Sequence, residues 1–405
     1  MAIGNTVGAV IAAALFALPV PRAAAAISDG VVKLGVLTDM SGVFSGFSGP
    51  GSVVAAQMAA EDFMAATSGF KVEVVSADHL NKPDVASAIA RRWLDTEGVD
   101  AILDLPNSAA ALAVGEIVRE KDKALLISGS SSSDLTGKAC SPNTLQWTYD
   151  SWSTASVIGN AVVRSGGDSW YFLTVDYAAG HALERDMANA VRGAGGQVLG
   201  AVRTPLGAPD FSSYLLQAQA SHAKVVGLAL AGSDLANVVK QAGEFGIVKG
   251  GQRLAATVVF ITDVHGFGLE AAQGLQFPGS FYWDLNDGTR AFARRFAERN
   301  GGAYPTMVQA GVYSSALHYL KSAHAIDSDT GGAVIKQMKA VPAEDPLFGK
   351  GAVRADGRKM HDIYLFEVKR PAESHGPWDY LKVVARIPAE QAMRPLDQGG
   401  CPLVH

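Results

Sequence analysis

Short apolar runs alternate with longer amphipathic stretches through the first third of the chain. Runs of four to eight apolar residues bounded by turn residues are typical of buried strands, and longer stretches with one apolar face are typical of helices. The repeated order, strand then helix, predicts a parallel sheet covered by helices. The predicted strands cover 32–37, 71–76, 101–105 and 124–128, and the predicted helices cover 52–67, 83–97 and 108–121.

The same alternation starts again near residue 150, which gives the chain two similar α/β halves. Because later segments return to these halves, the pattern predicts two lobes joined by several crossovers. The second half has predicted helices at 152–165, 179–194 and 234–245 and predicted strands at 170–175, 197–202, 225–230 and 258–262. Farther along we expect an extended segment at 275–283, helices at 288–300, 306–326 and 331–341, and strands at 362–368 and 379–387.

Two lobes of this kind direct the search for a binding site to one place. In open parallel α/β sheets, ligands bind outside the carboxyl ends of the strands, where the helix N-termini point. A cleft between two such lobes brings both sets of loops together. Residues in the loops that follow strands are therefore the first candidates for contact with a ligand.

The N-terminus has the pattern of an export signal. Residues 5–21 are apolar and uncharged, and Arg22 is followed by four alanines that fit the small-residue cleavage pattern of a secretory signal. We expect cleavage after Ala26. The alternative is an uncleaved anchor, because the apolar run is close to the roughly 20 residues that span a bilayer. The first five residues carry no Lys or Arg, so either the true start lies upstream or the signal is a weak one.

Composition and motifs exclude several classes of protein. The 405 residues are 48% apolar and 18% charged, and 34 basic against 39 acidic residues leave a net charge of −5, which argues against a nucleic-acid partner. The sequence has no GxxxxGK[ST], no GxGxxG after the first strand, no zinc-ligand spacing among its nine His and no GxSxG. We therefore predict no catalysis, no metal and no cofactor, with an α/β enzyme as the less favoured alternative.

The chain contains two cysteines, Cys140 and Cys401. An exported protein can keep a disulfide, and neither residue has the CxxC or His neighbours that indicate a redox or metal role. We expect a bridge between them, which would tie the C-terminal tail to a loop near the first third of the chain. The alternative is two free thiols.

Two hydroxyl-rich loops follow adjacent predicted strands. Asn107 and Ser108 enter the helix after the strand at 101–105, and the SGSSSS loop at 128–133 includes Ser130 and Ser131. A helix N-terminus offers unpaired N–H groups and a positive dipole end, which hold carboxylates well. Asn and Ser are also preferred N-cap residues, so simple capping is the alternative. Two such loops facing one cleft favour a carboxylate clamp.

Other candidate residues stand at strand ends or in loops. Tyr177 follows a predicted strand and is either a cleft residue or a turn residue. Asp263 follows another, where it would pair with a ligand cation or cap the next helix. Trp283 lies in an aromatic-rich segment and would either reach the cleft or belong to the core. Aromatic residues also occur in loops where core burial is less expected, at Phe44, Phe47 and Tyr149.

Eight short motifs follow one another along nearly the whole chain after the signal. They are KLGVLTDMSG at 33–42, AAQMAAEDF at 55–63, NSAAALAV at 107–114, SDLTG at 133–137, DYAAG at 176–180, DFSSY at 210–214, FGKG at 348–351 and DGR at 356–358. In this order and spacing they resemble the type I periplasmic substrate-binding proteins of ABC importers. The closest group is the branched-chain amino acid (leucine/isoleucine/valine) binding family.

The resemblance implies two Rossmann-like lobes with parallel central sheets, three hinge crossovers and a ligand enclosed between the lobes, as in a Venus flytrap. The implied segments are a signal peptide at 1–26, the first lobe at 27–149 and 280–347, and the second lobe at 150–279 and 348–405, with the tail returning toward Cys140. The mature protein would be a periplasmic monomer that delivers its solute to permease subunits in the inner membrane. A ligand-sensing receptor of the same fold is the alternative function.

The resemblance also implies roles for individual residues. The ligand carboxylate would be held by Ser108 and by Ser130 or Ser131, the amine by Asp263, and an aromatic cover would come from Phe44 or Phe47. The amino acid binders carry an aromatic residue near positions 231–233, and this chain has none there. The expected ligand is therefore a small carboxylate, which is either an amino acid or an aromatic or aliphatic carboxylic acid.

Overall fold

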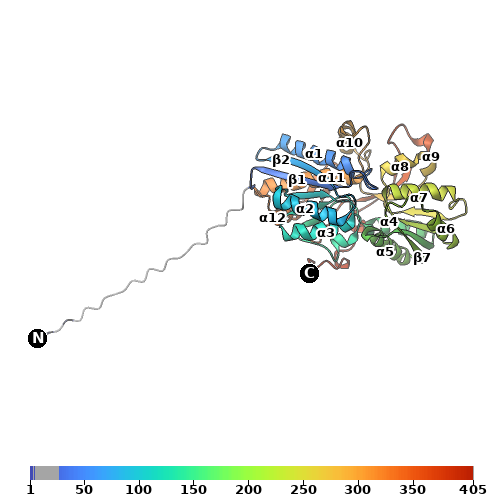
Figure 1. Ribbon diagram of the computed structural model, residues 1–405, viewed down its shortest axis with the longest axis horizontal. Helices are drawn as coiled ribbons and strands as arrows, with labels where there is room; N and C mark the ends of the chain where they lie inside the picture. Colours follow the sequence, from blue (N-terminus) through green and yellow to red (C-terminus); the bar gives the residue numbers. More distant parts are fainter. Residues whose placement is uncertain (3, 5–26, 405) are drawn as a thin grey trace.

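The computed structural model describes residues 1, 2, 4 and 27–404. Most of the predicted signal peptide, including the cleavage site after Ala26, lies outside the described residues. The described chain forms two α/β lobes that lie side by side (Figure 1). Among its helices, none has the length and the apolar character needed to cross a membrane.

The first lobe is built on a five-stranded parallel sheet with the strand order β2-β1-β3-β4-β5. All four strands predicted in this part of the chain are present, and β5 is an additional edge strand. The central strands β3 and β4 are buried along their whole length, which is why they are apolar in sequence apart from Asp104 at the end of β3. The strands are β1 (Val31–Thr38), β2 (Lys71–Asp78), β3 (Ala101–Asp104), β4 (Ala124–Ile127) and β5 (Thr144–Gln146).

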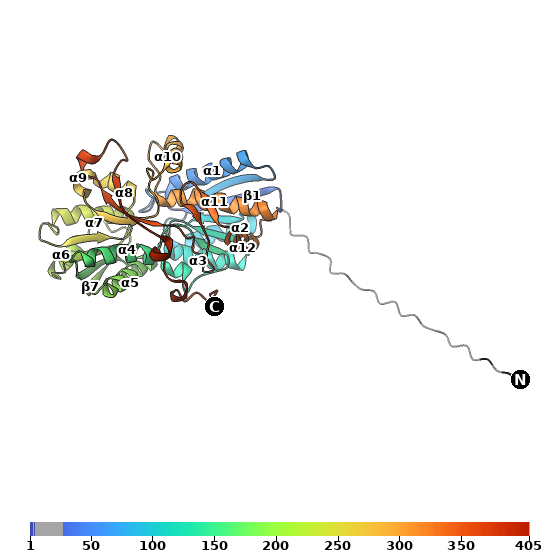
Figure 2. The same cartoon turned by 180° about the vertical axis from the view of Figure 1, so that it is seen from behind.

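Helices from two distant parts of the chain cover this sheet. The first set is α1 (Gly49–Ala66), α2 (Pro83–Thr96) and α3 (Ser108–Glu120), and the second is α10 (Asp287–Arg299), α11 (Met307–Ile326) and α12 (Gly331–Ala340). Helix α11 packs along α1 and contacts β3 and β4, and α12 contacts β4. The view from behind shows α10, α11 and α12 with α1 in the first lobe, away from α4–α9 of the second lobe, which precede them in sequence (Figure 2).

The second lobe repeats this plan on a four-stranded parallel sheet with the order β7-β6-β8-β9. Its strands are β6 (Ser169–Val175), β7 (Gln197–Thr204), β8 (Val225–Ala229) and β9 (Arg253–Ala256). Its helices are α4 (Ser151–Arg164), α5 (Ala178–Gly193), α6 (Ser212–Ala220), α7 (Gly232–Glu244), α8 (Ile261–Phe267) and α9 (Leu269–Ala272). The fold is therefore the predicted one, two α/β lobes with parallel central sheets.

The predicted strand at 258–262 is wrong. The last strand of the sheet is β9, which ends at Ala256, and α8 already begins at Ile261. The apolar run was misleading because Val258, Val259 and Phe260 are buried as a loop and a helix cap rather than as a strand. Periodicity does not separate a short buried strand from other short buried segments.

The rest of the chain links the two lobes. Strand β10 (Gln276–Gly279) pairs antiparallel with β13 (Ile363–Val368), which pairs with β14 (Leu381–Ile387), so only the first part of the predicted extended segment at 275–283 is a strand. A hairpin, β11 (Ala343–Asp345) and β12 (Gly349–Gly351), precedes them, and α13 (Ala389–Ala392) follows. The 3-10 turns are η1 (Ser133–Thr136), η2 (Pro371–Glu373) and η3 (Leu396–Gln398). The chain passes between the lobes after β5, after β10 and between β12 and β13.

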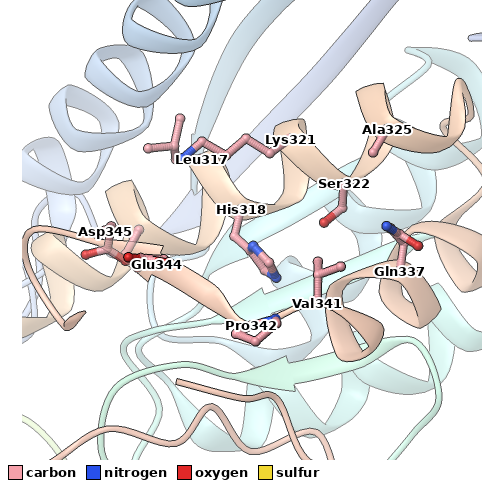
Figure 3. A pocket seen from close by; sticks show the side chains of 11 residues that line it. Leu317, His318, Lys321, Ser322, Ala325, Gln337, Val341, Pro342, Glu344 and Asp345 are labelled. Carbon is pink, nitrogen blue, oxygen red and sulfur yellow. Dashed lines mark hydrogen bonds between the residues drawn. The ribbon is translucent and has the colours of Figure 1, made fainter. Parts of the chain in front are cut away.

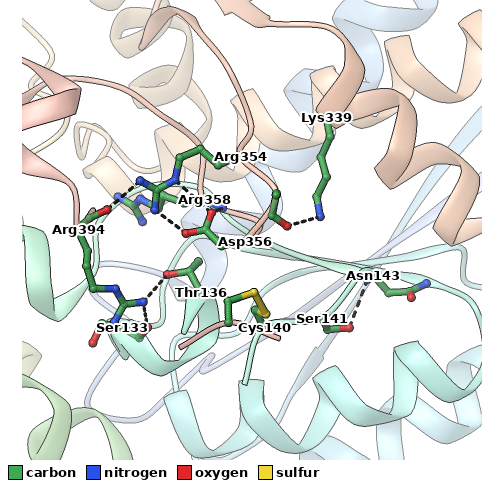
Figure 4. Close-up of a disulfide and its surroundings, with 12 residues drawn as sticks. Ser133, Thr136, Cys140, Ser141, Asn143, Lys339, Arg354, Asp356, Arg358 and Arg394 are labelled. Atoms are coloured by element: carbon green, nitrogen blue, oxygen red, sulfur yellow. Dashed lines mark hydrogen bonds and ion pairs between the residues drawn. A yellow bond between two sulfur atoms is a disulfide. The ribbon is translucent and has the colours of Figure 1, made fainter. Parts of the chain in front are cut away.

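The predicted disulfide is confirmed. Cys140 and Cys401 are bonded, with their Cα atoms 5.6 Å apart (Figure 4). Beside the bridge, the guanidinium of Arg394 donates to the carbonyl oxygen of Ser133 at 2.9 Å. The C-terminal segment is therefore fixed to the first lobe directly behind the loop that contains η1.

Candidate functional site

The two lobes touch at the carboxyl ends of their sheets. The loop after β1, residues 39–48, reaches the N-terminus of α7, where the N–H of Ser233 donates to the carbonyl oxygen of Val43 at 3.2 Å. Gly232 has a φ of +64°, and a Cβ atom there would lie 2.3 Å from that oxygen. Only glycine allows so close an approach in this conformation. The lobes are therefore closed on each other.

Four of the predicted aromatic residues meet at this contact. Phe47 stacks on Phe260 with ring centroids 4.1 Å apart, and the edge of Tyr149 meets Phe260 at 6.1 Å. Phe44 lies 5.4 Å from Phe47 and 6.3 Å from Tyr177. The rings come from both lobes and from the first crossover, so they form an apolar wall at the junction. Phe260 is the member that the sequence did not single out, because its apolar run reads as a core strand.

The first clamp loop, Asn107 and Ser108, serves in part to cap α3. Asn107 is the N-cap of α3: its Oδ1 accepts the N–H groups of Ala109 at 3.0 Å and Ala110 at 3.1 Å, and its Nδ2 donates to the carbonyl of Asn81 at 3.2 Å. Ser108 is fully buried, and its Oγ accepts the N–H of Ser132 at 3.3 Å. Asn107 thus serves the fold, and Ser108 links the first clamp loop to the second.

The second clamp loop, residues 128–133, has a small set of polar groups without partners in the described chain. The hydroxyl of Ser130 donates to the carbonyl of Leu105, and the hydroxyl of Tyr149 donates to the carbonyl of Gly129 at 2.9 Å. Ser131 is only 5% exposed, yet its hydroxyl bonds to no described residue. The amide N–H groups of Ser130 and Ser131 likewise donate to no acceptor in the described chain. These three groups make no hydrogen bond in the described chain, so each is free to donate to an anion.

Asp263 is a buried carboxylate on the second lobe's side of the junction. It occupies the third position of α8, where its Oδ2 accepts the N–H of Phe260 at 2.8 Å. Burial raises the pKa of Asp263 to about 7, and the Phe260 N–H opposes this only in part. The helix-capping alternative therefore describes one of its oxygens, and Oδ1 bonds to no described residue.

Tyr177 lies at the lobe junction, and Trp283 lies elsewhere. Tyr177 is the residue before α5, beside Phe44, and burial raises the pKa of its hydroxyl. Trp283 instead donates its indole N–H to the carbonyl of Trp378 at 2.7 Å and meets Tyr304 edge-on at 4.9 Å. Trp283 thus belongs to a separate aromatic group with Tyr304 and Trp378, and the structure does not bring it together with the other candidates.

Asp104 is a buried residue at the junction that the sequence reasoning missed. It ends β3 in the left-handed region with a φ of +80°, and its Oδ2 accepts the hydroxyl of Ser48. Its Oδ1 is buried and has no partner in the described part of the chain. Burial raises the pKa of Asp104 to about 6. The signal that would have found it is an acidic residue at the end of an otherwise apolar strand, where a site is expected.

A separate hollow of about 240 Å³ lies in the first lobe among α11, α12 and β11, lined by His318, Lys321 and Ser322 among others (Figure 3). It contains none of the residues predicted to bind a ligand. Across residues 27–404, no cluster of three or more His, Cys, Asp or Glu is arranged to hold a metal ion. The chemistry at the lobe junction is therefore that of serine hydroxyls, backbone amides, aromatic rings and two buried carboxyl groups.

Comparison with known proteins identifies a family and many similar structures, among them two from Burkholderia species. Residues 31–375 match the sequence model of the family described as periplasmic binding protein. A periplasmic binding protein from Burkholderia mallei is 45% identical, with a TM-score of 0.90, and the match covers 93% of this chain and 100% of that one. A branched-chain amino acid ABC transporter periplasmic ligand-binding protein from Burkholderia xenovorans LB400 is 39% identical, with a TM-score of 0.81 and coverage of 92% and 100%.

A curated relative matches over a shorter length. Leu/Ile/Val-binding protein homolog 6 from Brucella abortus is 29% identical over 224 residues. This match covers 54% of the present chain and 54% of the relative, so the chain spans about half the length of the curated relatives it matches.

Proposed function

The chain belongs to the periplasmic binding protein family, and from this premise we propose that it is the solute-binding component of an ABC importer. It captures a small carboxylate between its two lobes in the periplasm and delivers it to the permease. The observation that carries this proposal is the second clamp loop. Ser131, buried at the junction, keeps a hydroxyl and an amide N–H that bond to no described residue.

The proposed clamp holds the carboxylate by hydrogen bonds rather than by an ion pair. The amides of Ser130 and Ser131 and the Ser131 hydroxyl would donate to it, and the N-terminus of α3 would add its positive dipole end. Each charge-assisted hydrogen bond contributes about 1.5–3 kcal/mol. Three such bonds are enough for a small anion to compete with its hydration when the lobes exclude water.

Closure follows from contacts that come from both lobes. Phe44 and Phe47 belong to the first lobe and Tyr177 and Phe260 to the second, and the contacts Phe44–Tyr177 and Phe47–Phe260 join the two lobes. A ligand that touches both sides favours the closed state by its differential affinity for that state. The aromatic wall suits a ligand with an apolar body. A branched aliphatic amino acid and an aromatic acid both meet this description, and the similar protein from Burkholderia xenovorans belongs to a transporter of the first class.

The test uses matched pairs of compounds in a thermal-shift screen of the mature protein. The pairs are L-leucine with L-leucinamide and benzoate with benzamide, which differ only in the carboxylate. A ligand at 100 times its Kd adds about 2.7 kcal/mol to the free energy of unfolding, or about 3 °C for a protein of this size. We expect a shift with a carboxylate and none with its amide. Equal shifts within a pair would contradict the clamp.

The matching variant is Ser131→Ala. It should weaken binding of the best carboxylate about ten- to a hundredfold by calorimetry, because one charge-assisted hydrogen bond is lost. Ser212→Ala is the control and should bind like the wild type, because Ser212 begins α6 and its hydroxyl donates to Asp210 Oδ1 at 2.6 Å, within the second lobe. Unchanged affinity in Ser131→Ala would remove that hydroxyl from the site.

A further inference from the structure

Asp186 is a buried residue of α5 in the second lobe that accepts a hydrogen bond from the second clamp loop of the first lobe. The hydroxyls of Ser133 and Ser151 both donate to its Oδ2. Its Oδ1 accepts the Nε–H of Arg185 at 2.8 Å. The Asp186 side chain is 4% exposed, so its carboxylate depends on these partners rather than on water.

Ser151 and Ser133 connect Asp186 to Ser131 through hydrogen bonds. Ser151 donates its N–H to the carbonyl oxygen of Ser131 at 2.6 Å, and Ser133 donates its N–H to the Ser151 hydroxyl oxygen at 3.1 Å. Asp186 is therefore one residue removed from the backbone of the loop that presents the unpartnered donors. Asp186 itself touches none of those donors.

Arg185 closes the network on its far side. Its Nη2 donates to the Ser133 hydroxyl oxygen at 2.7 Å and its Nη1 to Asp134 Oδ1 at 2.9 Å. The donor and the acceptor of each hydrogen bond in the network are consequently fixed. The Ser133 and Ser151 hydroxyls each accept one N–H and must each donate to Asp186, which only an acceptor without hydrogens can satisfy.

We propose that Asp186 is a positioning residue for ligand binding, which holds the loop from Ser130 to Ser133 in the geometry that presents its free N–H and O–H groups to the ligand. The inference rests on the proposed function for its ligand, and it makes the second lobe part of the first lobe's clamp. Lobe closure then does more than enclose the solute, because contact with α5 also sets the shape of the loop that binds it.

Asp186→Asn tests this directly, because no orientation of an amide satisfies the network. If the amide oxygen replaces Oδ2, the NH₂ group faces the Arg185 Nε–H. If the amide is flipped, the NH₂ group takes the place of Oδ2, and the O–H groups of Ser133 and Ser151 lose their acceptor. The matched control is Glu184→Gln on the same helix. Glu184 accepts the Thr174 hydroxyl at 2.6 Å and pairs with Arg203 at 2.6 Å, both within the second lobe.

Binding of L-leucine and benzoate is measured by calorimetry in five proteins: wild type, Asp186→Asn, Ser131→Ala, the double variant of these two, and the control Glu184→Gln. We expect Asp186→Asn to weaken binding about tenfold or more in the wild type, and by a smaller factor when Ser131→Ala has already removed one of the donors that Asp186 positions. Glu184→Gln should stay within about twofold of the wild type. An unchanged affinity in Asp186→Asn, or a loss that adds in full to that of Ser131→Ala, would overturn the inference.

Hydrogen exchange of the peptide spanning residues 128–139 provides a readout that needs no ligand. We expect faster exchange in Asp186→Asn than in Glu184→Gln, and equal exchange in both would overturn the positioning role. If neither compound binds the wild type, the proposed function fails for these two classes while this comparison still decides the positioning role. Should Asp186→Asn fail to fold, Ser133→Ala removes one donor to Asp186 and is measured in the same way.

Discussion

Removing the bond between Cys140 and Cys401 should cost more stability than any single hydrogen bond in the protein. The bridge joins residues 261 positions apart, so in the unfolded chain it closes a very long loop. The chain-entropy relation gives a loss of about 19 cal/mol/K for a loop of this length, or about 5.5 kcal/mol at 25 °C, as an upper bound. Nearly two thirds of the chain is thereby restricted in the unfolded state.

This free energy converts into a modest shift of the melting temperature. At about 2.1 cal/mol/K per residue, roughly 380 residues have an unfolding entropy near 800 cal/mol/K, so the expected loss is about 7 °C for a single cooperative transition. The perturbation is the double variant Cys140→Ser/Cys401→Ser, measured by scanning calorimetry. Reductant should lower the Tm of the wild type by a similar amount and should leave the double variant unchanged.

Two results would refute this reasoning. A Tm loss below about 1 °C in the double variant would show that the bridge does not constrain the unfolded chain as the loop relation requires. Thiol titration of the denatured wild type, without reductant, should give no free thiol, and two reactive thiols would contradict the bridge itself. The double variant serves as the blank for the titration.

Two further predictions concern the lobe junction. Gly232→Ala places a Cβ against the Val43 carbonyl oxygen at a φ of +64°, so carboxylate binding should weaken about tenfold or more. In small-angle scattering, the ligand-saturated variant should have a larger radius of gyration than the ligand-saturated wild type. Equal radii of gyration would contradict the closed contact. The wild type should lose stability relative to Asp263→Asn as the pH rises. Burial raises the pKa of Asp263 from 3.8 to about 7, so the folded state binds this proton more tightly than the unfolded state does. The contribution of the protonated carboxyl to the free energy of unfolding, about 2–4 kcal/mol, is therefore lost as the pH rises from about 4 to 7. Calorimetry at pH 5 and pH 8 compares the two proteins, and an equal Tm difference at both values would rule out the raised pKa.

The alternation of apolar and amphipathic segments is enough to predict both central sheets. Strands such as β3, β4 and β8 are buried along their whole length and lie between covering helices. All of their positions except Asp104, the last of β3, are therefore apolar, and the runs are easy to recognise. Helix starts are equally local, because an N-cap acts within one turn. Asn107 and Asn286 are recognisable as caps from sequence, and both accept hydrogen bonds from the first turn of their helices.

Local reasoning fails where burial comes from elsewhere in the chain. Residues 258–260 are apolar because the second lobe's core and the lobe junction cover them, and not because they form a strand. Trp283 stands in a distinctive aromatic segment, but its position depends on Trp378, 95 residues away. The free oxygen of Asp104 is equally invisible, since it depends on which hydroxyls reach that carboxylate.

The clamp shows where this boundary between local and long-range information falls. Topology alone places the serine loop after β4 at the edge where a ligand is expected, yet four consecutive serines are equivalent in the sequence. Distant partners separate them: the Ser130 hydroxyl goes to Leu105, 25 residues away, and the Ser133 hydroxyl to Asp186, 53 residues away. The Ser132 oxygen accepts the N–H of Asp134 at 3.3 Å. Ser131 has the one hydroxyl of the four that makes no hydrogen bond in the described chain. Our proposal that Ser131 binds the carboxylate therefore rests on what its neighbours are already bonded to.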